Sequence, residues 1–173
     1  MTIEQTKLEQ ARKIALDVYR ETGDLKQASA KSGLNALSLF RYLTVKGALT
    51  MRDRLNMGTS QTKLGAQAEL EFKRLCPIAM LVNSDEKQHK SYDFILSNGQ
   101  TIDVKASRIQ KKRAQTTAWK FKIQRPYQTE KGADYYFLFA LHGDELTDGY
   151  TTYIMPTSIT SDIKALEFST KST

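Results

Sequence analysis

The chain has 173 residues, with 26 lysines and arginines against 19 acidic residues, and this length allows one or two small domains. Its formal net charge of +7 favours nucleic acid over a membrane as the partner, and the single cysteine, Cys76, excludes an internal disulfide or a metal site built from several thiolates. Because no apolar run is long enough to span a bilayer and the N-terminal residues lack the apolar core of a signal peptide, we expect a cytoplasmic protein without membrane contact.

The N-terminal residues predict short helices. Gly23 ends the first helix, and Asp24 can cap a second helix that extends to Ser32. In the first helix, residues 4–21, apolar side chains recur at the spacing of one buried face: Leu8, Ala11, Ile14, Ala15 and Val18.

A third helix would complete a helix-turn-helix layout. Asn35 can cap it, and Leu39 and Leu43 form its buried side. The segment 33–43, GLNALSLFRYL, is similar to the turn and recognition helix in the DNA-binding domains of Hin-type recombinases. Arg41 could contact a guanine edge or a phosphate, and a helical bundle that binds another protein or forms a dimer contact is the alternative. Four side chains are expected to face outward and to be free to enter a major groove: Ala36, Leu37, Phe40 and Arg41.

The next part of the sequence leads into a second domain. We place a helix-turn-helix domain at residues 1–48, a basic linker or short helix at 49–62, and an α/β domain at 63–173. A helix over residues 62–75 presents four apolar side chains on one face: Leu64, Ala68, Phe72 and Leu75. Residues 78–82 then read as the first strand of a sheet.

Asn98 and Gly99 predict a β-hairpin between two short apolar runs. A three-residue loop with Gly99 in the left-handed conformation pairs Phe94 with Ile102, whereas a two-residue loop would mix apolar and charged side chains on each face. The three-residue register places Phe94, Leu96, Ile102 and Val104 on one face.

The opposite face of this hairpin carries Asp93, Asp103 and Lys105. Two carboxylates side by side repel each other unless a cation lies between them, and hard oxygen ligands of this kind suit Mg²⁺. The sequence therefore predicts a candidate metal site at the hairpin.

Asp93 followed by Asp103-Val104-Lys105 resembles the active-site signature of the PD-(D/E)xK nucleases, although Tyr92 stands where the signature has proline. The upstream segment Gly65-Ala66-Gln67-Ala68-Glu69 is similar to the G-x-x-x-E helix of archaeal Holliday junction resolvases and of the PD-(D/E)xK homing endonucleases of group I introns. This resemblance, over about residues 64–156, implies a restriction-endonuclease-like mixed sheet core flanked by helices. It also implies that Asp93, Asp103 and Glu69 bind Mg²⁺, or Mn²⁺ in its place, and that Lys105 acts on the attacking water.

Two glutamates compete for the third acidic position. The helical periodicity slightly favours Glu71, and the resemblance favours Glu69, four residues after Gly65. We expect Glu69, with both glutamates as solvated surface charges as the alternative.

The C-terminal half contains a basic loop followed by strands. Residues 106–128 include seven basic and no acidic residues, so we expect DNA contacts from Arg108, Lys111, Lys112 and Arg113. Trp119 is expected on the inner face of a strand rather than stacked on a base. Further strands are predicted at residues 135–141 and 150–155, and a short amphipathic helix at 159–166.

These features predict a metal-dependent DNA endonuclease, most simply a site-specific enzyme of the homing or mobile-element type that acts on double-stranded DNA. A Holliday junction resolvase acting on branched DNA is the second alternative, and restriction-type cleavage is the third. A DNA-binding regulator with an inactive nuclease fold is an alternative of another class. Because one site cuts one strand, cleavage of both strands would need a homodimer or a higher homo-oligomer.

Overall fold

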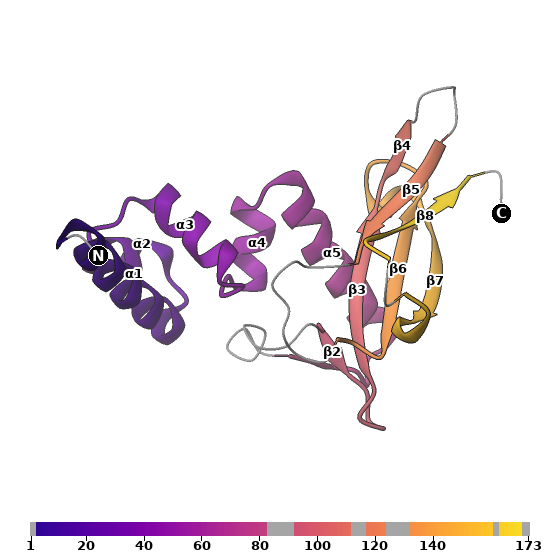
Figure 1. The fold of residues 1–173 in the computed structure, drawn as a ribbon, viewed down its shortest axis with the longest axis horizontal. Coiled ribbons are helices and arrows are strands. Elements are labelled where there is room, and N and C mark those ends of the chain that lie inside the picture. Colours follow the sequence, from indigo (N-terminus) through magenta and orange to yellow (C-terminus); the bar gives the residue numbers. More distant parts are fainter. Residues whose placement is uncertain (1–2, 83–91, 112–116, 124–131, 161–162, 171–173) are drawn as a thin grey trace. The chain divides into compact units, whose positions relative to one another are not determined.

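The computed structural model describes residues 3–82, 92–111, 117–123, 132–160 and 163–170 (Figure 1). Within these residues the chain forms two compact units that divide between Asp53 and Arg54. We call residues 3–53 the helical unit and the described residues from 54 onward the sheet unit. The predicted linker at residues 49–62 contains a short helix and the beginning of the next helix. None of the described helices is long and apolar enough to cross a membrane.

The helical unit contains three helices and the first residues of a fourth. They are α1 (Ile3–Thr22), α2 (Leu25–Ser32), α3 (Ala36–Val45) and α4 (Met51–Met57). The predicted caps are confirmed: the Asp24 side chain accepts from the backbone N–H groups of Lys26 and Gln27, and that of Asn35 accepts from Ser38. Gly33 ends α2 with a φ of 71°, a conformation that glycine adopts without strain.

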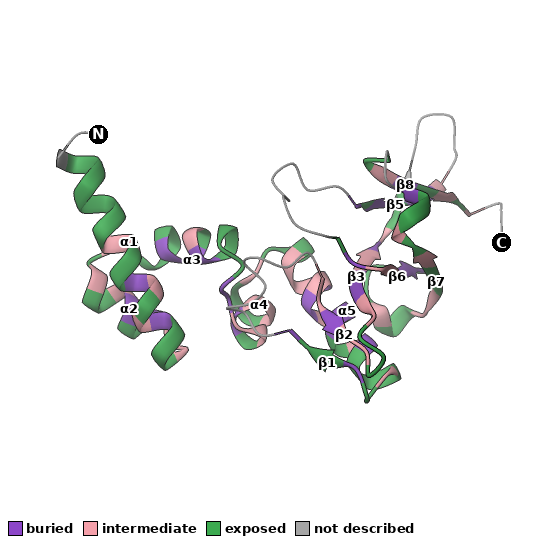
Figure 2. Ribbon diagram, turned by 60° about the horizontal axis from the view of Figure 1, so that its bottom comes forward, coloured by how far each residue is buried: buried purple, intermediate pink, exposed green. Residues whose placement is uncertain are grey.

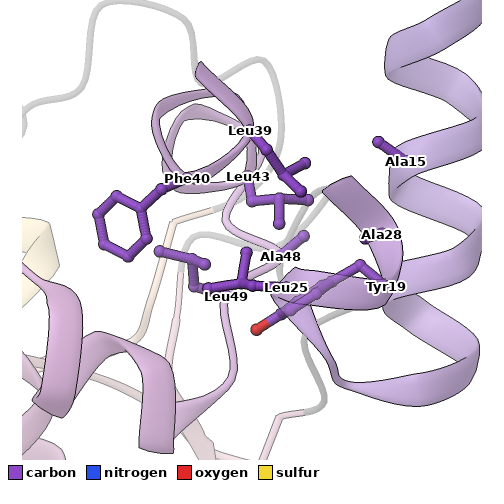
Figure 3. Close-up of a cluster of buried hydrophobic side chains, with 9 residues drawn as sticks. All are labelled: Ala15, Tyr19, Leu25, Ala28, Leu39, Phe40, Leu43, Ala48 and Leu49. Atoms are coloured by element: carbon purple, nitrogen blue, oxygen red, sulfur yellow. The ribbon is translucent and has the colours of Figure 1, made fainter. Parts of the chain in front are cut away.

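The core of the helical unit forms where α1, α2, α3 and the segment after α3 meet (Figure 3). Leu39 and Leu43 are fully buried, as predicted, and they pack in one cluster with Ala15 and Tyr19 of α1. The prediction for α1 was only partly right, because Leu8 and Ile14 are exposed. Figure 2 shows that most of α1 is exposed. A helix that packs through so narrow a stripe needs few of its apolar side chains for the core.

Phe40 corrects the predicted outward face of α3. Its side chain is only 9% exposed and belongs to the same core cluster as Leu39 and Leu43. The buried stripe of α3 is therefore wider than the two leucines, since a large ring at its border gains more by packing than by facing water. Phe40 is not available to read a groove, whereas Leu37 and Arg41 remain exposed.

The sheet unit is mixed α/β, as predicted. Helix α5 (Ser60–Leu75) precedes two sheets, one of five strands in the order β1-β2-β3-β6-β7 and one of three strands in the order β4-β5-β8. Strands β3 and β6 are parallel, and all other neighbouring pairs are antiparallel. The strands are β1 (Met80–Leu81), β2 (Phe94–Ile95), β3 (Thr101–Ser107), β4 (Ile109–Lys111), β5 (Thr117–Lys122), β6 (Tyr135–Leu141), β7 (Tyr150–Pro156) and β8 (Ala165–Ser169). Two 3-10 helices, Leu146–Asp148 and Thr157–Thr160, flank β7.

Side chains of strand β6 alternate between the two faces of the five-stranded sheet, and each face is covered by a different layer. Phe139 and Leu141 pack in one cluster with Leu64 and Phe72 of α5, while Leu138 and Ala140 pack on the other side. The cluster on that other side takes its remaining buried side chains from the three-stranded sheet and its flanks: Trp119, Phe121, Ile123 and Leu166. In the described part of the sheet unit, helix α5 covers one face and a second sheet, rather than helices, covers the other.

The predicted β2–β3 hairpin is confirmed. Phe94 pairs with Ile102, and Gly99 adopts a φ of 81° in the three-residue loop. The N–H of Leu96 donates to the carbonyl of Gln100 at 2.8 Å and closes this loop. Phe94, Ile102 and Val104 are buried against α5. The alternation of apolar and polar side chains along the two strands therefore determines the register.

The prediction of an amphipathic helix at residues 159–166 is wrong. The described residues there form the end of a 3-10 helix and then strand β8, which pairs with β5 through Trp119 opposite Phe168 and Phe121 opposite Leu166. Leu166 and Phe168 alternate with polar or small residues, which is the period of a strand, and the open edge of β5 provides the pairing partner.

Candidate active site

Strand β3 brings Asp103 and Lys105 together on one face. Residues two apart on a strand point to the same side, and the ammonium group of Lys105 donates to Oδ1 of Asp103. Asp103 is only 6% exposed, and the Lys105 side chain is also mostly covered. The contact shows that Asp103 and Lys105 share one face of β3, as the sequence predicts.

Asp93 lies directly before β2. Its backbone N–H donates to the carbonyl of Ile102 at 2.8 Å, so the hairpin ladder continues to Asp93. Its Oδ2 accepts a hydrogen bond of 2.9 Å from the backbone N–H of Val104, the residue between Asp103 and Lys105. The carboxylate of Asp93 is thus fixed beside the part of β3 that carries the pair.

Glu69 is buried on α5, with 5% of its surface exposed. Its two carboxylate oxygens accept from the guanidinium of Arg54 in α4, with Nη1 to Oε2 at 2.9 Å and Nη2 to Oε1 at 2.5 Å. Burial works against the charge of this guanidinium, but its hydrogen bonds to Glu69 and the negative charges of Glu69 and Asp93 raise the pKa of Arg54. The electrostatic influence of Asp93 on Arg54 connects the Glu69 pair with the hairpin.

Tight backbone turns allow Arg54 to reach Glu69 across 15 residues. Gly58 ends α4, and a Cβ at this position would lie 2.2 Å from the carbonyl oxygen of Arg54. Thr59 then caps α5 by accepting from the N–H of Thr62. Gly65 lies one turn before Glu69, and a Cβ there would lie 3.6 Å from Nη2 of Arg54, which is an ordinary van der Waals contact.

Glu71 has different partners from Glu69. Its carboxylate accepts two hydrogen bonds of 2.8 Å from Arg74, one turn later in α5, and one from the hydroxyl of Tyr150. Hydrogen bonds from Arg74 and then from Tyr150 lower the pKa of Glu71 to about 2. Glu69 is buried and Glu71 is only partly buried, so the alternative that both glutamates are solvated surface charges is wrong for Glu69.

The donor chemistry of this region suits a hard divalent cation. Glu69, Asp93 and Asp103 offer carboxylate oxygens, the ligands that Mg²⁺ prefers, and with Arg54 and Lys105 the five groups sum to a charge of −1. Within the described ranges, no three histidine, cysteine, aspartate or glutamate side chains are grouped closely enough to hold a metal ion. Among the described residues, Glu69 forms an ion pair with Arg54, and Asp103 forms one with Lys105.

The basic loop is described only in part. Arg108 follows β3, and its Nε donates to the carbonyl of Asp144 at 2.6 Å. Lys111 ends β4, and Lys112 and Arg113 lie outside the described residues. Trp119 is buried and donates from Nε1 to the carbonyl of Leu141 at 2.7 Å, which confirms the prediction that it faces inward.

The exposed surface of α3 adjoins a groove in the helical unit. Leu37 is 62% exposed, and Arg41 is exposed one helical turn later. The guanidinium of Arg12 and the ammonium of Lys46 lie 5.5 and 5.9 Å from the ring centre of Tyr42. The groove has a volume of about 480 Å³ and is lined by Glu9, Arg12, Ser38, Arg41, Tyr42, Val45 and Lys46.

Arg54 is the residue of this region that the sequence did not single out. It lies in the stretch 49–62, for which the sequence predicts only a basic linker or a short helix, although Gly58 between two helical segments is a sequence signal for a tight turn. No protein-family model matches the chain, and no curated protein matches it. The functional interpretation therefore depends on the geometry and chemistry of these residues.

Proposed function

We propose that the chain is a metal-dependent endonuclease that hydrolyses phosphodiester bonds in double-stranded DNA at specific sites. The observation that carries the proposal is the Asp103–Lys105 pair on β3, with Asp93 hydrogen-bonded to the residue between them and Glu69 buried on α5. Carboxylates can hold a divalent ion, and a lysine beside them can act on a water molecule, so these groups support the hydrolysis of a phosphodiester bond.

The proposed roles follow from the chemistry of each group. Asp93, Asp103 and Glu69 would hold Mg²⁺, which supplies polarisation of the phosphoryl oxygen and a lower pKa of bound water. Lys105, fixed by Asp103, would orient the attacking water and offset negative charge that develops on the phosphate. The exposed Leu37 and Arg41 of α3 would read the duplex, and Arg108 and its basic neighbours would contact phosphates. A homodimer would place one site on each strand.

The test is cleavage of a plasmid and of a four-way junction, with Mg²⁺ or with a chelator, by the full chain and by Lys105→Ala. We expect sequence-specific duplex cleavage that requires Mg²⁺ and falls at least about 100-fold in the variant, because positioned proton-transfer groups typically contribute that much. Lys120→Ala is the matched control, since Lys120 is likewise a strand lysine paired with an acid, Glu167 of the neighbouring strand at 3.2 Å, but at an exposed position.

The outcomes separate the alternative functions. Symmetric nicking of the junction alone would support a structure-specific resolvase. Retarded migration of duplex DNA without cleavage in any lane would contradict the nuclease proposal and support a DNA-binding regulator. Equal loss in Lys105→Ala and Lys120→Ala would show that the loss does not come from the candidate site. Circular dichroism of both variants checks that each is folded.

A further inference from the structure

Arg54 occupies both oxygens of the carboxylate that would complete the metal site. The two hydrogen bonds of 2.9 and 2.5 Å form a bidentate pair, the strongest geometry that a guanidinium and a carboxylate adopt. Only 20% of the Arg54 side chain and 6% of the Glu69 side chain are exposed. Water therefore competes weakly for either partner.

A divalent ion and this guanidinium cannot share Glu69 without strong repulsion. Both are cations, the guanidinium already occupies both oxygens of Glu69, and the pair lies in a buried region where charges are poorly screened. The negative charge of Asp93 also attracts Arg54. A metal ion bound to Asp93 would therefore repel the guanidinium. Arg54 lies in the last turn of a short helix, α4, so its side chain can leave without disturbing a long element.

We propose that Arg54 is the resident counter-cation of Glu69 and must leave this carboxylate before Glu69 can bind Mg²⁺. Arg54 and the metal ion are thus competitive ligands of one side chain. This inference rests on the proposed function, which supplies the metal, and it adds a regulatory step: the position of Arg54 sets how readily the site is loaded. Arg54 is a positioning residue, since it acts through Glu69.

Calorimetric titration of the full chain with Mg²⁺ alone tests this competition. Arg54→Met should bind Mg²⁺ more tightly than the unsubstituted chain by about 5- to 150-fold, the usual range of coupling between two ligands. Adding Glu69→Gln to Arg54→Met should abolish the gain. Arg74→Met is the matched control, because Arg74 makes the corresponding bidentate pair with Glu71 two residues further along α5 and should leave the affinity unchanged.

Two further measurements keep the test decisive if Arg54→Met folds poorly. Arg54→Lys keeps a positive charge but cannot form the planar fork, so its Mg²⁺ affinity should lie between those of the unsubstituted chain and Arg54→Met. In addition, Mg²⁺ should raise the melting temperature of Arg54→Met more than that of the unsubstituted chain, because the ion replaces the positive charge that Arg54 places on Glu69.

The failure of this inference is distinguishable from the failure of the proposed function. Equal Mg²⁺ affinities for the unsubstituted chain, Arg54→Met and Arg54→Lys would overturn the competition and leave a metal-dependent nuclease intact. The absence of Mg²⁺ binding in all of these proteins would overturn both proposals. An equal gain in Arg74→Met would also overturn the competition, because it would show a general effect of charge.

Discussion

Asp53 in the helical unit and Glu69 in the sheet unit are both buried carboxylates, but their partners differ in charge. Asp53 accepts a hydrogen bond of 2.5 Å from the neutral hydroxyl of Tyr19. Its other near partner, Arg52, lies 3.6 Å away on a side chain that is 70% exposed. Glu69, in contrast, is held by the buried fork of Arg54.

This difference distinguishes a carboxylate with a structural role, Asp53, from one whose cationic partner could be exchanged for another cation, Glu69. The phenol of Tyr19 satisfies Asp53 at hydrogen-bond distance, and the cation near Asp53, Arg52, is mostly exposed, so the Tyr19 contact is the one that holds α1 to the start of α4. A guanidinium on Glu69 can be replaced by a different cation without leaving the carboxylate alone. Buried acids with cationic partners are therefore the better candidates for ion binding in this chain.

The largest expected effect is on the sheet unit. Arg54→Met should lower its free energy of unfolding by about 3–5 kcal/mol, because the buried Glu69 would lose the bidentate counter-charge that Arg54 supplies. Adding Glu69→Leu should restore most of the loss, since an apolar pair of similar volume replaces a buried ion pair. Urea unfolding followed by fluorescence of Trp119, the only tryptophan, measures this unit. A double variant as unstable as Arg54→Met would contradict the ion-pair explanation.

Tyr19→Phe should produce the corresponding but smaller effect in the helical unit. It removes the hydrogen bond to Asp53, and bonds to charged groups typically contribute about 1.5–3 kcal/mol. The loss should be visible in the helical signal of circular dichroism during urea unfolding, with the Trp119 transition unchanged. Asp53→Asn is the control, since an amide oxygen can still accept from Tyr19. A shift of the Trp119 transition alone would contradict the assignment of this contact to the helical unit.

Arg41→Ala tests the surface of the helical unit rather than its interior. Arg41 is exposed, so the melting temperature should not change, while affinity for duplex DNA should fall. If Arg41 contacts a phosphate, the slope of log affinity against log salt should decrease by about 0.9. If it contacts a guanine, discrimination between sequences should be lost instead. Lys13→Ala on α1 is the control, and unchanged DNA affinity in Arg41→Ala would remove α3 from the proposed reading surface.

The smallest expected effect is the pH-dependent contribution of Glu71 to stability. Glu71 lies on the same helix as Glu69 but is less buried. Hydrogen bonds from Arg74 and Tyr150 hold the pKa of Glu71 at about 2, below its ordinary value of 4.5. Its contribution to stability is therefore present above pH 4.5 and is lost as the pH falls toward 2. Because solvent screens this partly exposed pair, the contribution should be below about 1 kcal/mol. Melting temperatures from pH 6 to 2 should fall less steeply in Glu71→Gln, and parallel curves would contradict this.

Local patterns in the sequence predicted the elements that depend on neighbouring residues. Asn35 and Asp24 cap their helices because a cap requires only a side chain and the next few N–H groups. The register of Phe94 opposite Ile102 follows from the alternation of side chains and from Gly99. The Asp103–Lys105 pair was predictable for the same reason, because two residues on one strand share a face.

The partners of distant residues were decided only by the tertiary structure. The sequence determined the caps, the hairpin and the acidic residues beside it, since these follow from the periods of helices and strands. It did not determine that Phe40 is buried, that residues 165–169 form a strand on the edge of β5, or that Arg54 pairs with Glu69. Such contacts depend on which surfaces meet after the chain has folded, because burial and ion pairing are properties of three-dimensional neighbours and not of sequence spacing.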